Sequence, residues 1–240
     1  MANAGGLLVT ELGEPWIVAS NLVRGPIGLA MPDQKQIHGT NLNARTRCRF
    51  GSANQYDGQV PRQALIDHLV NNALRTDGPF TLASGGVSDW YIDARQTTFD
   101  GFGARHVGGA VLEVLKPEVM AVGGMTMGAD PIALAVAMTA AGLGRDVKAF
   151  SIRKQPKDHG TGGRIVGPID PSMPLAVVED TTTTGSSAVD AARYLLDEGF
   201  EIMQAIALVD RSRGRARSNF EAIGIEHVAL ITPDDLGFSS

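Results

Sequence analysis

The chain reads LAVVEDTTTTGSS from Leu175 to Ser187. The four apolar residues at its start predict a buried strand, and the apolar spacing of residues 187–198 predicts a helix directly after it. The hydroxyl side chains and Gly185 between them let the backbone wrap a phosphate, whose charge the helix N-terminus favours. Glu179 and Asp180 fit such a site if they bind ribose hydroxyls or a metal held by the sugar. The alternative is a helix cap beside two solvated acids.

Outward from this stretch, apolar segments alternate between strand and helix patterns. Further strands are predicted at Val119–Val122, Val147–Ile152, Ile202–Val209 and Val228–Ile231, with short strand-like segments at Phe80–Leu82 and Trp90–Asp93. Helices are predicted from Arg62 to a stop at Thr76, and over 104–115 and 131–143. The alternation predicts an α/β fold, a mostly parallel sheet with helices on both faces. Ligands then bind at the carboxyl ends of the strands, near the point where the strand order reverses.

Length and composition bound the remaining possibilities. The chain has 240 residues, 43% of them hydrophobic and 20% charged, with a formal net charge of −5. This balance argues against general nucleic-acid binding, and the apolar runs are too short for a membrane helix. The single cysteine, Cys48, cannot form an internal disulfide, and no secretory signal precedes it, so a cytoplasmic location is expected. Residues 1–60 lack a sustained apolar period and are predicted to form an irregular, poorly ordered extension to a domain at 61–240.

A basic, glycine-rich loop lies within residues 151–167. Lys154, Lys157 and His159 supply charge, and the glycines that follow supply conformational freedom. A loop with both properties is suited to cover a polyphosphate and to neutralise it as it leaves. His159 could also donate a proton or a hydrogen bond. The alternative is a solvated basic loop.

The segment from Leu175 to Ser187 resembles the phosphoribosyl diphosphate (PRPP) signature of type I phosphoribosyltransferases. The resemblance implies that family's fold, a parallel α/β core with a small hood built from N-terminal and C-terminal segments. It does not identify the base. The implied PRPP contacts are Arg153, Lys154, Lys157, His159, Glu179, Asp180, Thr181, Thr182, Thr183, Thr184, Gly185, Ser186 and Ser187.

The order Arg-Lys-x-x-Lys-Asp-His-Gly at residues 153–160 resembles the catalytic loop of the orotate phosphoribosyltransferase family. Residues 80–93 resemble that family's substrate hairpin, 124–131 its pyrophosphate loop, and 208–211 its Asp-Arg motif. The resemblance implies that Lys157, His159 and Asp180 are catalytic. It also implies orotate contacts from Tyr91, Ile92, Thr183 and Arg211.

The resemblance further implies the reaction of orotate with PRPP to give orotidine 5′-monophosphate and pyrophosphate. Mg²⁺ would be held mainly by PRPP, with no direct metal ligand from the protein. The implied assembly is a homodimer with shared active sites, without nucleic-acid or membrane partners. Ala83 and Gly128 stand where many members carry lysine. Two alternatives stay open: a type I phosphoribosyltransferase for a purine or uracil, and a non-catalytic PRPP-binding regulator.

Overall fold

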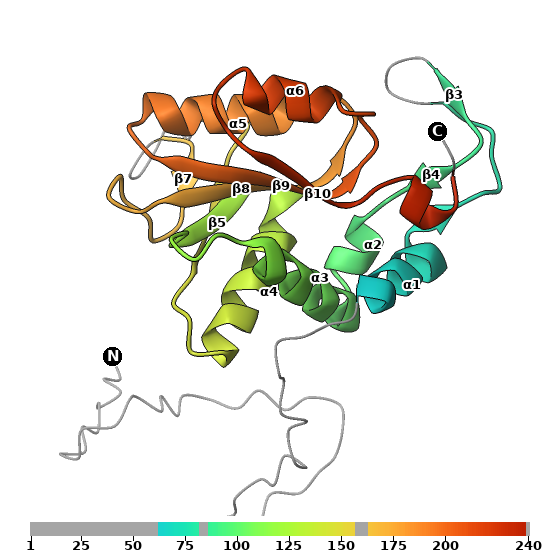
Figure 1. Ribbon diagram of the computed structural model, residues 1–240, viewed down its shortest axis with the longest axis horizontal. Coiled ribbons are helices and arrows are strands. Elements are labelled where there is room, and N and C mark those ends of the chain that lie inside the picture. Colours follow the sequence, from blue (N-terminus) through green and yellow to red (C-terminus); the bar gives the residue numbers. More distant parts are fainter. Residues whose placement is uncertain (1–61, 82–85, 157–162, 239–240) are drawn as a thin grey trace, which may run out of the picture. The chain divides into compact units, whose positions relative to one another are not determined.

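The computed structural model of the protein describes residues 62–81, 86–156 and 163–238 (Figure 1). The predicted extension, residues 1–60, lies outside the described residues, and its boundary with the domain stays a prediction. Three residues singled out above also lie outside them, namely Ala83, Lys157 and His159.

The centre of the domain is a six-stranded sheet. Its strands run, from one edge to the other, in the order β10 (His227–Ile231), β9 (Ile202–Asp210), β8 (Leu175–Thr182), β5 (Ala121–Met125), β6 (Lys148–Ile152) and β7 (Ile165–Val166). The pairs from β10 to β6 are all parallel, and β7 joins the edge antiparallel. The strand order reverses between β5 and β8, so these two strands flank the predicted ligand-binding position.

Helices cover both faces of this sheet. Figure 1 shows α1 (Arg62–Asn72), α3 (Gly101–Val114) and α4 (Ala129–Gly142) on one side, and α5 (Ser186–Asp197) and α6 (Arg215–Glu221) on the other. Each side has its own apolar cluster, one around α3 and α4 and one around α5. Val178 of β8 packs into the first cluster and Val177 into the second, which explains the continuous apolar run of this strand. The predicted α/β fold is therefore confirmed.

The element bounds differ from the sequence predictions in ways that have local causes. Helix α3 begins at Gly101, because the Asp100 carboxylate accepts hydrogen bonds from the backbone nitrogens of Phe102 and Gly103, both at 2.9 Å. Strand β8 continues four residues past the predicted end at Val178, because β9 extends beside it as far as Asp210. The two acids and the first two threonines therefore belong to the strand, not to the loop.

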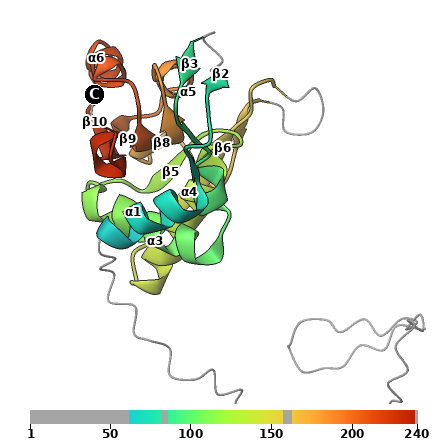
Figure 2. The same ribbon diagram turned by 90° about the vertical axis from the view of Figure 1, so that its right-hand side faces the viewer.

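A small second layer, here called the hood, consists of the described residues 74–81, 86–98 and 232–238. In it β1 (Leu74–Arg75) pairs with β4 (Tyr91–Ile92), and β2 (Phe80–Thr81) pairs with β3 (Val87–Ser88). Figure 2 shows β2 and β3 side by side, apart from the central sheet. The hood also contains α2 (Arg95–Thr98) and a 3-10 turn (Asp234–Leu236). The chain's C-terminal segment thus joins an N-terminal one, as the family resemblance implied.

Candidate active site

The Thr/Gly loop between β8 and α5 is short and held from two sides. Gly185 has a φ of 78°, and a side chain there would begin 3.0 Å from the Cβ of Ala216. Both facts favour glycine at this position. The amide of Asn219, on α6, donates to the Thr184 carbonyl at 2.9 Å. The loop therefore presents exposed Thr183, Thr184, Ser186 and Ser187 at the start of α5, where free backbone N–H groups attract anions.

The pKa values of Glu179 and Asp180, near the end of β8, are both raised. Burial, with a smaller effect from neighbouring Asp180, raises the pKa of Glu179 to about 7. The Thr182 hydroxyl, itself 2% exposed, donates to the Glu179 carboxylate at 3.3 Å. Burial also raises the pKa of Asp180, while a hydrogen bond from the Thr181 backbone N–H and the positive charge of Arg95 oppose that rise. Two adjacent buried carboxylates thus lie where a sugar diphosphate is expected.

The predicted pyrophosphate loop follows β5 and leads into α4. Thr126 donates to the Asp130 carboxylate at 2.7 Å, which fixes the turn across the loop. A side chain at Gly128 would begin 2.6 Å from Oδ1 of Asp180. The loop therefore passes so close to β8 that a side chain at position 128 would require the Asp180 carboxylate to shift.

Arg211, directly after β9, is held by aromatic side chains. Its guanidinium carbon lies 3.7 Å from the centre of the Trp90 ring, and the opposite face of Trp90 stacks on Phe238, with 4.5 Å between centroids and 8° between planes. Ser88 accepts from Nη2 of Arg211 at 3.4 Å. The backbone N–H of Arg211 bonds to the Thr182 carbonyl at 2.7 Å, so the arginine is tied to the end of β8.

Two cavities open at this edge of the sheet. The first, of about 590 Å³ and here called the Arg211 cavity, is lined by Thr81, Tyr91, Ile92, Asp93, Ala94, Arg95, Asp180, Thr181, Thr183, Thr184, Arg211 and Arg215. The second, of about 360 Å³ and here called the Lys154 cavity, is lined by Arg95, Met125, Thr126, Met127, Gly128, Lys154, Val178, Glu179, Asp180, Ser187 and Ala188. Asp180 and Arg95 line both, so the cavities meet there.

The basic loop after β6 is described only at its two ends. Arg153 and Arg164 bond to one another there, backbone to backbone at 2.8 Å and from Nε of Arg164 to the Arg153 carbonyl at 2.7 Å. The Arg164 guanidinium lies 4.5 Å from the centre of the Tyr194 ring on α5. Lys154 lines its cavity, whereas Arg153 lines neither cavity. The predicted roles of Lys157 and His159 concern residues outside the described ones and stay predictions.

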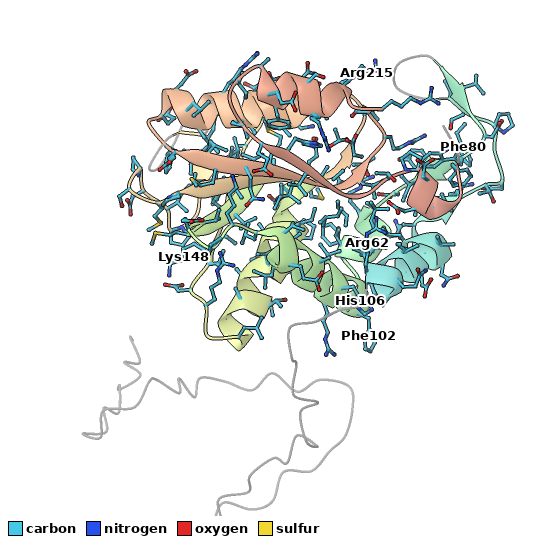
Figure 3. The ribbon with its side chains drawn as sticks, in the orientation of Figure 1. Arg62, Phe80, Phe102, His106, Lys148 and Arg215 are labelled. Atoms are coloured by element: carbon cyan, nitrogen blue, oxygen red, sulfur yellow. The ribbon has the colours of Figure 1, made fainter. Side chains whose placement is uncertain are left out.

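The structure brings together most of the residues that the sequence singled out, and it adds others. Tyr91, Ile92, Thr183 and Arg211 share one cavity, as the family resemblance implied for orotate. Arg215, an exposed residue at the start of α6, also lines this cavity. Figure 3 shows Arg215 and Phe80 at the same end of the molecule. Arg95 and Asn219 were not predicted. The sequence signal that could have identified Arg95 is its spacing, two residues after Asp93 and close to the aromatic residues 90–91.

Metal and membrane features are limited in the described part of the chain. Among residues 62–81, 86–156 and 163–238, no group of three His, Cys, Asp or Glu side chains gathers as a metal site. Mg²⁺, however, commonly takes one or two carboxylates together with substrate phosphates, and the adjacent Glu179 and Asp180 fit that smaller requirement. None of the described helices has the length and apolar character needed to cross a membrane.

Comparison with known proteins places this site in a family. No family model matches the chain. The orotate phosphoribosyltransferase of Tropheryma whipplei (strain Twist) is 37% identical over 206 residues, which are 85% of this chain and 94% of that protein. The chain belongs to the orotate phosphoribosyltransferase family.

Solved structures of this family agree with the fold. The crystal structure of the Mycobacterium tuberculosis H37Rv orotate phosphoribosyltransferase with Fe(III) dicitrate matches with a TM-score of 0.66 and 32% identity, covering 74% of this chain and all of that one. The structure of the same enzyme with PRPP matches with a TM-score of 0.62 and 31% identity over the same share of each chain.

Proposed function

We propose that this protein transfers the phosphoribosyl group of PRPP to orotate, giving orotidine 5′-monophosphate and pyrophosphate. Family membership supports the reaction. The observation that carries it in this molecule is that the Arg211 cavity and the Lys154 cavity meet at Asp180. A planar carboxylated base fits beside Arg211, a diphosphate fits beside the pyrophosphate loop, and the ribose that links them fits at the acids of β8.

The base is held through its carboxylate and its ring. The fork of Arg211 matches the orotate carboxylate, and its stacking on Trp90 fixes the direction of the fork. Tyr91, whose ring is 37% exposed, and Ile92 supply apolar surface for the pyrimidine. Thr183 supplies a hydroxyl on the opposite side of the same cavity.

The donor is held by its phosphate and its sugar. The turn at 184–187 and the first N–H groups of α5 bind the 5′-phosphate. Glu179 and Asp180 accept hydrogen bonds from the ribose hydroxyls, which gives the two acids a role that a phosphate alone would not. Thr182 acts through Glu179, since its buried hydroxyl donates to that carboxylate.

In the reaction, the bond from ribose C1 to pyrophosphate breaks and pyrophosphate leaves with the electron pair. A ring nitrogen of orotate, having lost its proton, bonds to C1. The chain contributes positioning and charge stabilisation rather than a covalent nucleophile. Lys157 and His159 cover the leaving group, and Lys157 stabilises its growing charge. Mg²⁺, carried by PRPP beside Glu179 and Asp180, would neutralise part of the same charge.

We also propose a homodimer with shared active sites. Helices α3 and α4 leave an apolar face on which Phe102 is 74% exposed and Met138 is 75% exposed, around a shallow hollow of about 490 Å³. Figure 3 shows Phe102 pointing away from the domain. A second copy of the chain is the occupant that the family favours. Mixing an inactive Lys157 variant with an inactive Asp180 variant is expected to restore partial activity. Absence of recovery after verified subunit exchange would contradict shared sites.

We propose that the catalytic domain spans residues 61–240 and that the protein is cytoplasmic. The motifs that resemble the family all lie within residues 61–240, so deleting residues 1–58 is expected to leave turnover intact. A folded, dimeric truncation without activity would show that the extension takes part. We place the protein in the cytoplasm, which cell fractionation tests.

The deciding assay follows orotate consumption by absorbance, with and without PRPP, and with Mg²⁺ or a chelator. Consumption that requires both PRPP and Mg²⁺ supports the reaction and the base together. If orotate is not consumed while PRPP still binds by calorimetry, a panel of purines and uracil decides between another base and a non-catalytic regulator.

A further inference from the structure

Arg95 is the described cation that borders both cavities. It lies at the start of α2, in the hood, and its Nε donates to Oδ1 of Asp93 at 2.7 Å. Its backbone N–H bonds to the same oxygen at 3.3 Å, and Gln96 holds the other oxygen of Asp93 at 3.2 Å. Within the described residues, no acceptor bonds to the two terminal nitrogens of Arg95. The side chain is therefore oriented through Nε, and its fork remains available to a ligand.

The facing wall of the Lys154 cavity lacks a cation of its own. The pyrophosphate-loop residues that line it are Met125, Thr126, Met127 and Gly128, and none of these four is charged. A Cβ at position 128 would lie 2.6 Å from Oδ1 and 2.8 Å from Cγ of Asp180, so any side chain there would require the Asp180 carboxylate to shift. Among the described residues, Lys154 and Arg95 are the cations that line this cavity.

The two acids that line the Lys154 cavity make a nearby cation favourable for binding a diphosphate. Asp180, together with Glu179 when it is ionised, repels a diphosphate, and the repulsion increases as the leaving group gains charge. Arg95 is close enough for its charge to oppose the upward shift that burial imposes on the pKa of Asp180. A cation at this place offsets the repulsion of the acids and attracts the phosphates.

We propose that Arg95 donates hydrogen bonds from its terminal nitrogens to the pyrophosphate group of PRPP, and so supplies from the hood the cation that the pyrophosphate loop lacks. The inference rests on the proposed function, because it assumes a diphosphate in the Lys154 cavity. A guanidinium whose Nε is occupied presents two parallel donors, which suit two phosphate oxygens.

The test compares Arg95→Gln and Arg95→Lys with Lys148→Gln. Lys148 likewise pairs with an acid two residues away, Asp146, at 2.6 Å, and Figure 3 shows it at the end of the molecule opposite Arg215. Binding of inorganic pyrophosphate in Mg²⁺ is measured by calorimetry, and the KM for orotate and kcat are measured in parallel.

For Arg95→Gln we expect the Kd of pyrophosphate to rise about 10- to 100-fold, the loss typical of a charge-assisted hydrogen bond. The KM for orotate should stay within about twofold, and kcat should fall, because the charge on pyrophosphate grows as its bond to C1 breaks. Arg95→Lys keeps the charge without the fork and should lie between Arg95→Gln and wild type. Lys148→Gln should match wild type.

The outcomes separate this inference from the proposed function. An unchanged pyrophosphate Kd in Arg95→Gln, with the wild type active on orotate, would overturn the role of Arg95 alone. Equal losses for pyrophosphate and orotate would indicate a collapsed hood and would also overturn it. If wild type consumed no orotate, the proposed function would fail, while the pyrophosphate titration would still decide whether Arg95 binds a diphosphate.

Discussion

In the Arg211 cavity, a single cation is stacked on Trp90, which is itself stacked on Phe238, so the positive charge is in position before any ligand arrives. In the Lys154 cavity, two partly buried carboxylates lie beside the pyrophosphate loop, and among the described residues the cations that line the cavity are Arg95 and Lys154. The first cavity is preformed for an anion. In the second cavity the acids repel an anion, and a polyphosphate that carried a metal ion would reduce this repulsion. At the acceptor end, the proposed orotate side, packing holds the charged group in position in the free protein. At the donor end, the proposed PRPP side, the charges are balanced only when the substrate binds.

The largest expected effect comes from Asp180, the acid that lines both cavities. Asp180→Asn removes the charged acceptor for the ribose hydroxyls. Two charge-assisted hydrogen bonds weaken together, so kcat/KM for PRPP should fall on the order of 10³-fold. Steady-state kinetics measure it, with Asp170→Asn as the control, because the Asp170 carboxylate accepts hydrogen bonds from Ser172 in its own turn and lines neither cavity. A loss below about tenfold would remove Asp180 from the catalytic group.

A second effect is expected at the donor end alone. Lys157→Ala should lower kcat about 10²-fold, and more than it changes the KM for PRPP, since the lysine acts most strongly as pyrophosphate gains charge. Single-turnover and steady-state rates separate the two contributions. An unchanged kcat with only a raised KM would contradict this role.

A third effect is confined to the acceptor end. Trp90→Leu removes the cation–π support of Arg211, worth up to about 2 kcal/mol in a partly buried site, and should raise the KM for orotate about 10- to 30-fold. Trp90→Phe should recover most of the loss, and Phe238→Ala should cost about threefold. The KM for PRPP serves as the internal control. Equal effects on both substrates would show that Trp90 supports the whole domain and not Arg211 in particular.

The smallest effect concerns the free enzyme and its pH dependence. The pKa of Glu179 rises on folding to about 7, so the folded protein binds this proton more tightly than the unfolded chain does. The free energy of unfolding should therefore fall as pH rises toward and through 7, by about 1 kcal/mol between pH 6 and pH 8. Glu179→Gln should flatten this slope. Denaturant titrations at both pH values measure it, and equal slopes in the two proteins would refute a buried, protonated Glu179.

Much of the fold and of the site could be predicted from local sequence. The apolar run of β8 and the periodic face of α5 contain their own signals, and Gly185 falls where the turn requires a positive φ. The length of β8 could not be predicted, because Thr181 and Thr182 become strand residues only through pairing with Val209 and Asp210. Helix α6 escaped detection, since its polar sequence buries only Ala216 and Phe220.

The missed site residues depend on contacts between distant segments. Arg95 carries no motif of its own, and its place between the cavities arises because the hood folds back over β8. The sequence could show that Gly128 departs from the family pattern, but it could not show which contact in the structure favours glycine there. Only the fold brings Asp180 within 2.6 Å of the point where a side chain would begin.

The hydrogen bond from Arg211 to the Thr182 carbonyl has a consequence for how such an enzyme can change over time. The acids proposed to hold the sugar lie on β8, and the arginine proposed to hold the base directly follows β9, the neighbouring strand. Their spacing is therefore inherited with the sheet. A one-residue slip between β8 and β9 would turn every side chain to the opposite face. Replacements in the hood, by contrast, can alter which base is accepted while the distance between the reacting partners stays the same. Proteins that share this sheet can therefore evolve to accept different bases while they keep the same reaction.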